Sequence, residues 1–221
     1  MSETRDILYI GNRRYSSWSL RGWLAVALAG LAVEERVLPL SGGATEAVRA
    51  VSPSGFVPYL EHRGARVWDS LAIVEYAAEY HAAIWPEDRV ARAHARSISA
   101  EMHSGFRDLR MAMPMNCCRT CPGAGQTPGA LADIGRIETI WAETRGRYGA
   151  GGDFLFGATF GGADVMFAPV VSRCLTYEPP LSSASKDYIA AVRAHPLMAA
   201  WYEAAVAEPA SWTVAKYEAV A

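Results

Sequence analysis

Residues 52–60 read Ser52-Pro53-Ser54-Gly55-Phe56-Val57-Pro58-Tyr59-Leu60, a turn-rich loop that runs into a short apolar segment. Proline donates no hydrogen bond to a neighbouring strand, so Pro58 belongs at the start of a strand or in a turn. A cis Val57-Pro58 bond fits this place, and it would direct the backbone N–H and C=O of Val57 away from the sheet. Groups presented in this way can pair with an extended peptide, as an added strand does. The loop therefore predicts a peptide-binding edge beside a sheet.

Strand-like and helix-like segments alternate on both sides of this loop. Apolar runs that end at turn residues predict strands, and apolar residues with a helical period predict helices. The segment His62-Arg63-Gly64-Ala65 is expected to form a hairpin turn between the last two strands. A strand-helix-strand unit gives parallel pairing and a hairpin gives antiparallel pairing, so the order β-α-β-α-β-β-α predicts a mixed four-stranded sheet of the thioredoxin-like α/β type. The expected strands are 7–10, 35–40, 57–61 and 66–68, and the expected helices are 18–31, 45–51 and 70–80.

The remainder of the sequence shows no strand pattern. Residues 82–89, which contain Trp85-Pro86, are interpreted as a linker, and the segments after them have helical periodicity. We therefore expect a thioredoxin-like domain over residues 1–81 and an all-helical domain over residues 90–221. The expected helices of the second domain are 90–113, 131–148, 164–177, 186–194 and 197–206, and a loop is expected at 116–128.

Composition limits the classes of function that the protein can have. With 221 residues, of which 51% are hydrophobic, the chain can bury the cores of two small domains. The formal net charge of -2, without a long run of one sign, argues against nucleic acid or an anionic membrane as a partner. No apolar stretch approaches the roughly 20 residues that span a bilayer, and the polar N-terminus lacks the features of a signal peptide. We expect a cytoplasmic protein.

The cysteines raise the question of a metal site. Zinc normally takes four ligands, and only Cys174 and scattered histidines could complete a set with the C-C-x-x-C cluster of Cys117, Cys118 and Cys121. A thiol-rich surface loop is the favoured interpretation, and no metal is expected.

Hydroxyl groups gather where the first helix is expected to begin, in the segment Tyr15-Ser16-Ser17-Trp18-Ser19-Leu20-Arg21. Thioredoxins hold their C-x-x-C at this place, and the absence of cysteine here excludes disulfide exchange by that route. A serine hydroxyl can instead donate a hydrogen bond to a bound thiolate. A free thiol is only a few per cent ionised at pH 7, so such a bond would activate it. The alternative is that the serines only cap the helix.

A second helix start lies at Asp69-Ser70. A helix N-terminus presents unpaired N–H groups and a partial positive charge, which attract a carboxylate, and the Ser70 hydroxyl can add a further donor. The Asp69 carboxylate offers a partner for an ammonium group. The pair therefore suits a ligand with both an α-carboxylate and an α-amine, although a simple helix cap is the alternative.

Together, the serine-rich helix start, the P-S-G-F-V-P loop and the D-S pair resemble the cytosolic glutathione transferase superfamily, and most closely its serine-type zeta, theta and phi classes, as a bacterial member. The segment 154–164 is similar to the helix-capping motif of that family. Three positions depart from the family pattern. Gly161 stands where the motif has Ser or Thr, Ser52 replaces the usual Asn, and Trp18 replaces the cysteine of zeta enzymes.

The resemblance implies roles for individual residues. Ser16 would activate the thiol of glutathione, with Ser17 as the alternative if the loop is shifted by one residue. Val57 and Pro58 would bind the cysteinyl backbone of glutathione, and Asp69 and Ser70 would hold its γ-glutamyl end. A small hydrophobic electrophile would lie over the thiol, against the helical domain; the candidates for this pocket are Tyr15, Trp18, His103, Met111 and Met115.

The implied function is conjugation of glutathione to hydrophobic electrophiles, with glutathione as co-substrate, no cofactor and a homodimeric assembly. Two alternatives remain open. One is a glutathione-dependent isomerase of the maleylacetoacetate isomerase type, which the presence of Trp18 puts in doubt. The other is a non-catalytic protein that binds glutathione or another ligand on the same fold.

Overall fold

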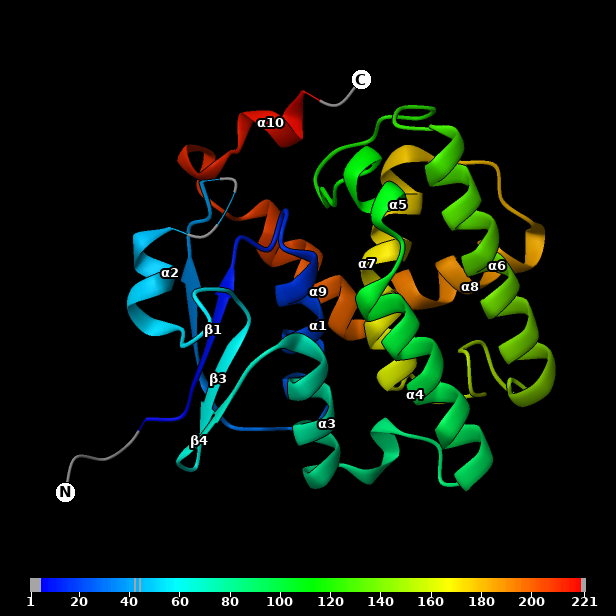
Figure 1. Cartoon of the computed structure of the whole chain (residues 1–221), viewed down its shortest axis with the longest axis horizontal. Helices are drawn as coiled ribbons and strands as arrows, with labels where there is room; N and C mark the ends of the chain where they lie inside the picture. Colours follow the sequence, from blue (N-terminus) through cyan, green and yellow to red (C-terminus); the bar gives the residue numbers. More distant parts are fainter. Residues whose placement is uncertain (1–4, 42, 44, 220–221) are drawn as a thin grey trace.

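The computed structural model describes residues 5–41, 43 and 45–219 (Figure 1). Its N-terminal part contains a four-stranded sheet with the strand order β2-β1-β3-β4. Strand β1 is parallel to β2 and antiparallel to β3, and β3 is antiparallel to β4, so the predicted mixed sheet is confirmed. The strands are β1 (Ile7–Gly11), β2 (Glu34–Leu38), β3 (Tyr59–His62) and β4 (Ala65–Val67).

The predicted hairpin between β3 and β4 is present, and its turn is two residues long rather than the four expected, because the strands extend to His62 and Ala65. Arg63 and Gly64 both have positive φ, 49° and 82°, which is the backbone geometry of a tight turn that matches the twist of antiparallel strands. Glycine adopts this conformation without steric cost, so Gly64 allows the chain to reverse within two residues.

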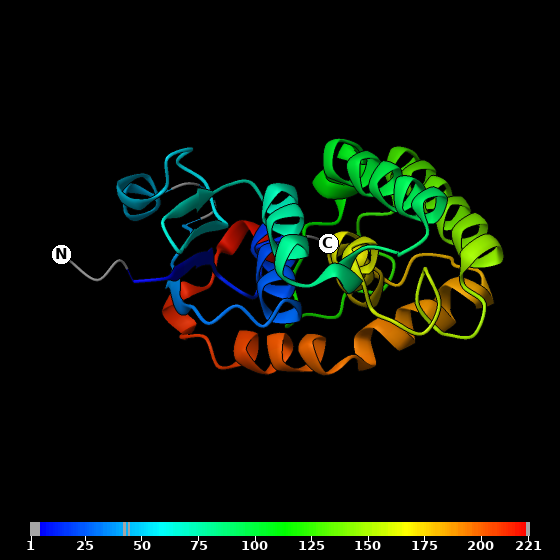
Figure 2. The same cartoon turned by 90° about the horizontal axis from the view of Figure 1, so that it is seen from below.

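Three helices surround the sheet. Helices α1 (Ser17–Leu28) and α3 (Ser70–Tyr80) cover one face, and α2 (Glu46–Val51) lies on the other (Figures 1 and 2). The first face buries a core that includes Leu8, Ile10 and Leu60 of the strands. On the second face the rings of Tyr9 and Tyr59 stack with their centroids 5.6 Å apart.

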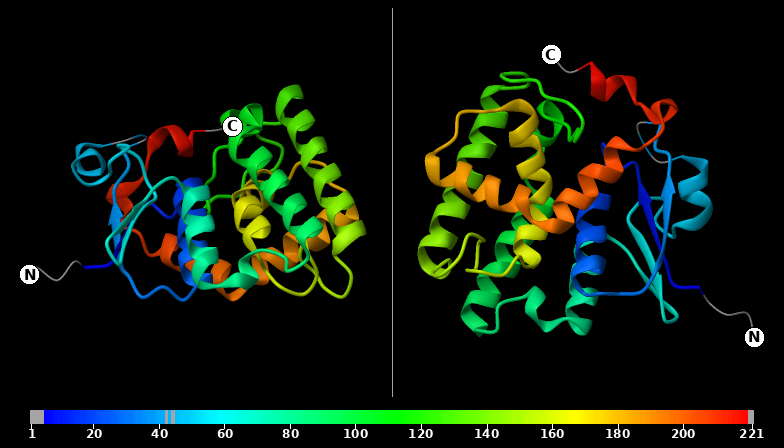
Figure 3. Two further views of the ribbon diagram at one scale, coloured as in Figure 1. Left: turned by 60° about the horizontal axis from the view of Figure 1, so that its bottom comes forward. Right: turned by 180° about the vertical axis from the view of Figure 1, so that it is seen from behind.

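The rest of the described chain is mostly helical. Helix α7 lies at its centre with nearly every residue buried, and it packs against α1 of the first part as well as against α4 and α8 (Figure 3). No helix of the described residues is long and apolar enough to cross a membrane. The elements are η1 (Ala82–Ile84), α4 (Arg89–Ser104), α5 (Arg107–Ala112), α6 (Pro128–Tyr148), α7 (Gly162–Tyr177), α8 (Ser183–Ala194), α9 (Pro196–Val206), η2 (Ala210–Trp212) and α10 (Ala215–Glu218).

The prediction of one helix over residues 90–113 is wrong, because the chain breaks between α4 and α5. Gly105 is extended and Phe106 adopts the left-handed region at φ 62°. Burial of the Phe106 side chain in the core offsets the cost of this conformation. The Arg110 side chain also donates to the carbonyl oxygens of Met102 and Gly105, which stabilises the end of α4. The break turns α5 away from the axis of α4.

Candidate functional site

The serine-rich segment lies between β1 and α1. The N–H groups of Tyr15 and Ser16 both donate to the carbonyl oxygen of Asn12, so the loop is tightly folded. The Asn12 side chain in turn accepts from the N–H of Leu40 at 2.6 Å. These contacts fix Ser16 as the N-cap of α1 and Ser17 as its first residue.

The Ser16 oxygen is held in place while its proton can be redirected. It accepts from the Ser19 N–H at 3.3 Å, and its hydroxyl donates to Ser19 Oγ at 2.8 Å. Ser19 Oγ is itself fixed by the N–H of Gly11 at 2.8 Å. A hydroxyl proton rotates freely about its C–O bond, so Ser16 can donate to a ligand without losing its role as cap.

The Val57-Pro58 bond is cis, as predicted from the sequence. In the sheet Tyr9 pairs with Tyr59, so Val57 lies before the paired residues of β3 and next to the loop that leads into α1. Helix α1 approaches the proline closely, since a Cβ added at Gly22 would lie 2.7 Å from Cγ of Pro58. The fold therefore brings the Val57-Pro58 loop and the start of α1 to the same end of the sheet.

The pair Asp69-Ser70 begins α3 and also touches the helical part of the molecule. Asp69 Oδ1 caps the helix by accepting from the N–H groups of Leu71 and Ala72. Asp69 Oδ2 lies 2.9 Å from Nε2 of His103, near the end of α4. Burial lowers the pKa of His103, against the opposing effect of Asp69. The hydroxyl of Ser70 is buried and has no hydrogen-bond partner among the described residues.

A cavity of about 430 Å³ opens at the start of α1. It brings together six predicted residues from two distant stretches of the sequence, because α5, the loop after it and the C-terminal α10 face the N-terminus of α1. Met111 is 73% exposed at its rim, whereas Met115 is 1% exposed in its wall. The predicted residues that line the cavity are Tyr15, Ser16, Ser17, Trp18, Met111 and Met115.

The other predicted residues lie elsewhere. Val57, Pro58, Asp69 and Ser70 are not among the described residues that line this cavity, and neither is His103. His103 instead packs edge-on against Trp18, with the ring centroids 5.3 Å apart, and contacts Asp69. It thus connects the D-S pair to the cavity wall.

Sequence reasoning missed the cations of the cavity, which are Arg110, Arg173 and Lys216. One signal was available: Arg173 comes soon after the apolar run 165–171 of α7, and a charge in such a buried helix requires an explanation. Tyr217, on α10, also lines the cavity, and its ring lies 5.2 Å from that of Tyr15.

Two protein-family models match this chain. A glutathione S-transferase N-terminal domain model matches residues 15–79, and a glutathione S-transferase C-terminal domain model matches residues 123–204. The chain belongs to the glutathione S-transferase family. The predicted family, fold class and enzyme class are thereby confirmed.

Curated relatives of this glutathione S-transferase carry a common name. A probable maleylacetoacetate isomerase of Caenorhabditis elegans is 35% identical over 112 residues, which are 49% of this chain and 51% of the relative. The chain thus spans about half the length of that protein in the match. Maleylacetoacetate isomerase of Rattus norvegicus is 29% identical over 194 residues, which are 82% of this chain and 84% of the relative.

Solved structures resemble this glutathione S-transferase over nearly its whole length. A glutathione transferase homologue from Burkholderia, with bound glutathione, has a TM-score of 0.70 and 23% identity, covering 93% of this chain and 100% of the other. A theta-class glutathione S-transferase from Xanthomonas axonopodis pv. citri, with glutathione bound, has a TM-score of 0.62 and 24% identity. The match covers 92% of this chain and 98% of the other. At this level of identity the likeness establishes the fold.

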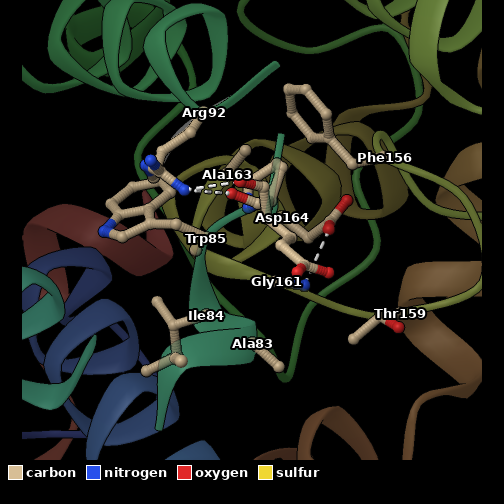
Figure 4. Close-up of a pocket in the computed structure, with 13 residues that line it drawn as sticks. Ala83, Ile84, Trp85, Arg92, Phe156, Thr159, Gly161, Ala163 and Asp164 are labelled. Carbon is tan, nitrogen blue, oxygen red and sulfur yellow. Dashed lines mark hydrogen bonds between the residues drawn. The ribbon is translucent and has the colours of Figure 1, made fainter. Parts of the chain in front are cut away.

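A larger cavity, of about 570 Å³, lies between the linker and α7 of this glutathione S-transferase (Figure 4). Two of its charged side chains already have structural partners. Arg92 donates to the carbonyl oxygens of Pro86 and Glu87, and Asp164 accepts from the N–H of Gly161 at 2.9 Å. A Cβ at Gly161 would lie 3.0 Å from the Ile84 carbonyl oxygen, which accounts for glycine where the family motif has Ser or Thr. We therefore place the chemistry at the smaller cavity.

The four cysteines are free thiols. Burial raises the pKa of Cys117 and of Cys174 to about 12, so both remain protonated at neutral pH. Cys118 is exposed, and burial nevertheless raises its pKa. A raised pKa reduces the thiolate character that a nucleophilic cysteine needs, so neither Cys117 nor Cys118 is suited to that role.

Proposed function

We propose that the protein binds glutathione along Val57-Pro58, holds its thiol as a thiolate at the start of α1 and transfers it to an electrophile in the smaller cavity. The supporting observation is the cavity itself, in which the hydroxyl-bearing residues Ser16 and Ser17 meet apolar Trp18 and Met115. Such a pocket can hold a sulfur nucleophile beside an apolar compound.

Each part of glutathione has a partner in this proposal. The backbone of Val57 pairs with the cysteinyl residue, and Asp69 and Ser70 take the ammonium and carboxylate of the γ-glutamyl end. The unpartnered Ser70 hydroxyl supplies a donor that the ligand would satisfy. The thiolate lies at the N-terminus of α1, where the partial positive charge of the helix and the Ser16 hydroxyl both favour the charged form.

The chemical step then follows from the thiolate. Its sulfur attacks an electrophilic carbon, a carbon–sulfur bond forms, and the leaving group departs with its electron pair. No side chain needs to act as a base during this step, because the thiol has already lost its proton to solvent. The protein's contribution is to lower the thiol pKa and to hold both reactants together.

A second candidate is isomerisation, which is favoured by the names of the curated relatives. There the same thiolate would add to a carbon–carbon double bond, allow rotation, and leave again. Assays with glutathione and either a chloronitrobenzene or maleylacetone separate the two. We expect turnover of the chloronitrobenzene. Turnover of maleylacetone alone would favour the isomerase, and glutathione binding without turnover of either would favour the non-catalytic alternative.

The role of Asp69 can be tested without destroying its helix cap. Asn caps helices as well as Asp does, so Asp69→Asn removes the charge and keeps the bonds to α3. We expect KM for glutathione to rise about tenfold, because a charge-assisted bond to the ammonium is lost, with little change in kcat.

Asp88→Asn is the matched control, since Asp88 caps α4 with the same geometry and lies away from the site. An unchanged KM in Asp69→Asn, or an equal rise in both variants, would contradict the assignment. We also propose the homodimer that the family resemblance implies. Light scattering that gives a monomer mass at micromolar concentration would refute it.

A further inference from the structure

The loop that carries Ser16 is held from outside its own part of the molecule. Residues 12–16 join β1 to α1, next to the four-stranded sheet. Helix α9 of the helical part packs against α1 (Figure 3), and the chain that follows α9 reaches this loop. The peptide groups of Arg13 and Arg14 therefore meet residues that are far away in the sequence.

The N–H and C=O groups of these two residues bind to the helical part. The Glu208 carboxylate accepts from the N–H of Arg13 at 2.5 Å and from the N–H of Arg14 at 3.2 Å. The carbonyl oxygen of Arg13 accepts from Nε1 of Trp201 at 3.0 Å. The carbonyl oxygen of Arg14 accepts from the N–H of Cys117 at 3.0 Å. The hydrogen bonds of two successive peptide units thus depend on tertiary packing.

Glu208 makes the charged contacts of this set. A carboxylate that binds two successive N–H groups fixes the backbone to which they belong, and bonds to an ionised acceptor are roughly twice as strong as those between neutral groups. The side chain is half-buried between α9 and the loop. Burial raises the pKa of Glu208, whereas the N–H groups of Arg13 and Arg14 lower it. Of the three partners, Glu208 therefore has the strongest hold on the loop.

This hold extends to the activating hydroxyl. The next two N–H groups along the chain, those of Tyr15 and Ser16, donate to the carbonyl oxygen of Asn12. The backbone is consequently fixed from Arg13 to the N-cap of α1, and the direction of the Cα–Cβ bond of Ser16 is fixed with it. A hydrogen bond weakens steeply when its angle is poor, so a displaced Ser16 would be a weak donor to sulfur.

We propose that Glu208 is a positioning residue for thiol activation, because its carboxylate holds the loop in the one geometry that directs the Ser16 hydroxyl to the sulfur of glutathione. The inference rests on the role of Ser16 in the proposed function. Glu208 is not among the described residues that line the smaller cavity, so it acts through the loop and not by touching a reactant. The helical part then contributes to activating the thiol as well as to binding the acceptor.

Glu208→Ala is expected to raise the thiol pKa of bound glutathione by about one unit and to lower kcat near pH 7 about tenfold. Thiolate absorbance in the ultraviolet, measured against pH, reports the shift. Affinity for S-methylglutathione, which has no thiol proton, should stay the same. Glu208→Gln keeps an oxygen that can accept from the loop, so it should recover most of the loss.

The sign of the shift separates geometry from charge. A negative charge near sulfur disfavours the thiolate, so a role of charge alone predicts a lower thiol pKa in both Glu208→Ala and Glu208→Gln, and that result would overturn the proposal. Glu208→Asp keeps the charge and shortens the side chain by one methylene. It should raise the thiol pKa in part, and it decides the question if Glu208→Ala does not fold; an unchanged titration in Glu208→Asp would then overturn the proposal.

Glu138→Ala is the matched control. The Glu138 carboxylate, on α6, likewise accepts from a backbone N–H, that of Ser182 at 2.9 Å, and also from the Ser182 hydroxyl at 2.8 Å. Its removal should leave the thiol titration of the parent protein unchanged. Equal shifts in Glu138→Ala and Glu208→Ala would reduce the role of Glu208 to general stability and overturn the proposal.

A double-mutant cycle tests whether Glu208 acts through Ser16. Glu208→Ala should add little to the thiol pKa in the Ser16→Ala background, because the positioned hydroxyl is already absent. Additive shifts, or a shift in Ser16→Ala with none in Glu208→Ala, would overturn this inference and leave the proposed function intact. No shift in Ser16→Ala would contradict the serine assignment of the proposed function, and this inference with it.

Discussion

Ser16→Ala is expected to raise the thiol pKa of bound glutathione and to lower activity near pH 7 by about tenfold for each unit of that rise. The Ser16 oxygen is already fixed by the Ser19 N–H, so its proton can turn to a thiolate at little cost. Without this donor the charged form of sulfur is less favourable. Thiolate absorbance in the ultraviolet, measured against pH, reports the shift, and activity should partly recover at high pH.

Loss of the cap must be separated from loss of the donor. Ser182 caps α8 in a similar way, accepting from the Ser185 N–H at 3.3 Å, and its hydroxyl can donate to Ser185 Oγ at 3.0 Å or to Glu138 Oε1 at 2.8 Å. Ser182→Ala should therefore cost about 1 kcal/mol of stability, as Ser16→Ala does, without changing the thiol titration. A shift in Ser17→Ala and not in Ser16→Ala would move the role by one residue. A shift in neither would end the serine assignment.

Asp164→Ala is expected to lower the free energy of unfolding by about 3–5 kcal/mol. Asp164 is 1% exposed and accepts from the N–H of Leu155, the N–H of Gly161 and the hydroxyl of Tyr188, at 3.1, 2.9 and 2.9 Å. Alanine would leave these donors without a partner in the interior. Urea unfolding measures the loss. Asp88→Ala, at an exposed cap, should cost only about 1 kcal/mol, and equal losses in the two variants would contradict this account.

The same residue gives stability an unusual pH dependence. Burial raises the pKa of Asp164 to about 6, above its ordinary value of 3.8. Between these values the folded protein binds the proton more strongly than the unfolded chain, so the contribution of Asp164 to stability falls as pH rises through this window. Asp164→Asn should remove that part of the pH dependence. An identical slope in the parent and the variant would count against it.

Local sequence signals were sufficient for most of the fold. Proline before a strand, glycine in the hairpin and hydroxyl or carboxylate groups at helix starts act on their own neighbours, so they could be interpreted without the structure. The break at Gly105-Phe106 could not, because the left-handed conformation of Phe106 is stabilised by the burial of its ring among distant residues. The placement of Arg110 in the cavity depends on that break.

The same distinction between local sequence signals and tertiary packing applies to the candidate site. Ser16 and Asp69 were predicted because each begins a helix, whereas the contact between Asp69 and His103 joins α3 to α4 across the two parts of the molecule. Arg173 was not predicted to line the cavity, since its position depends on how α7 packs against α1. Contacts of this kind are determined by tertiary packing, and no local sequence pattern predicts them.

The wall formed by the C-terminal tail has a consequence for how this enzyme can diversify. Residues of α10 line the cavity, yet neither η2 nor α10 contributes a buried residue to the core. Substitutions there can alter which acceptors fit while leaving the stability of the fold nearly unchanged. Acceptor preference is therefore open to mutational drift and to laboratory selection in a segment of about ten residues, independently of the serine and aspartate that hold glutathione in our proposal.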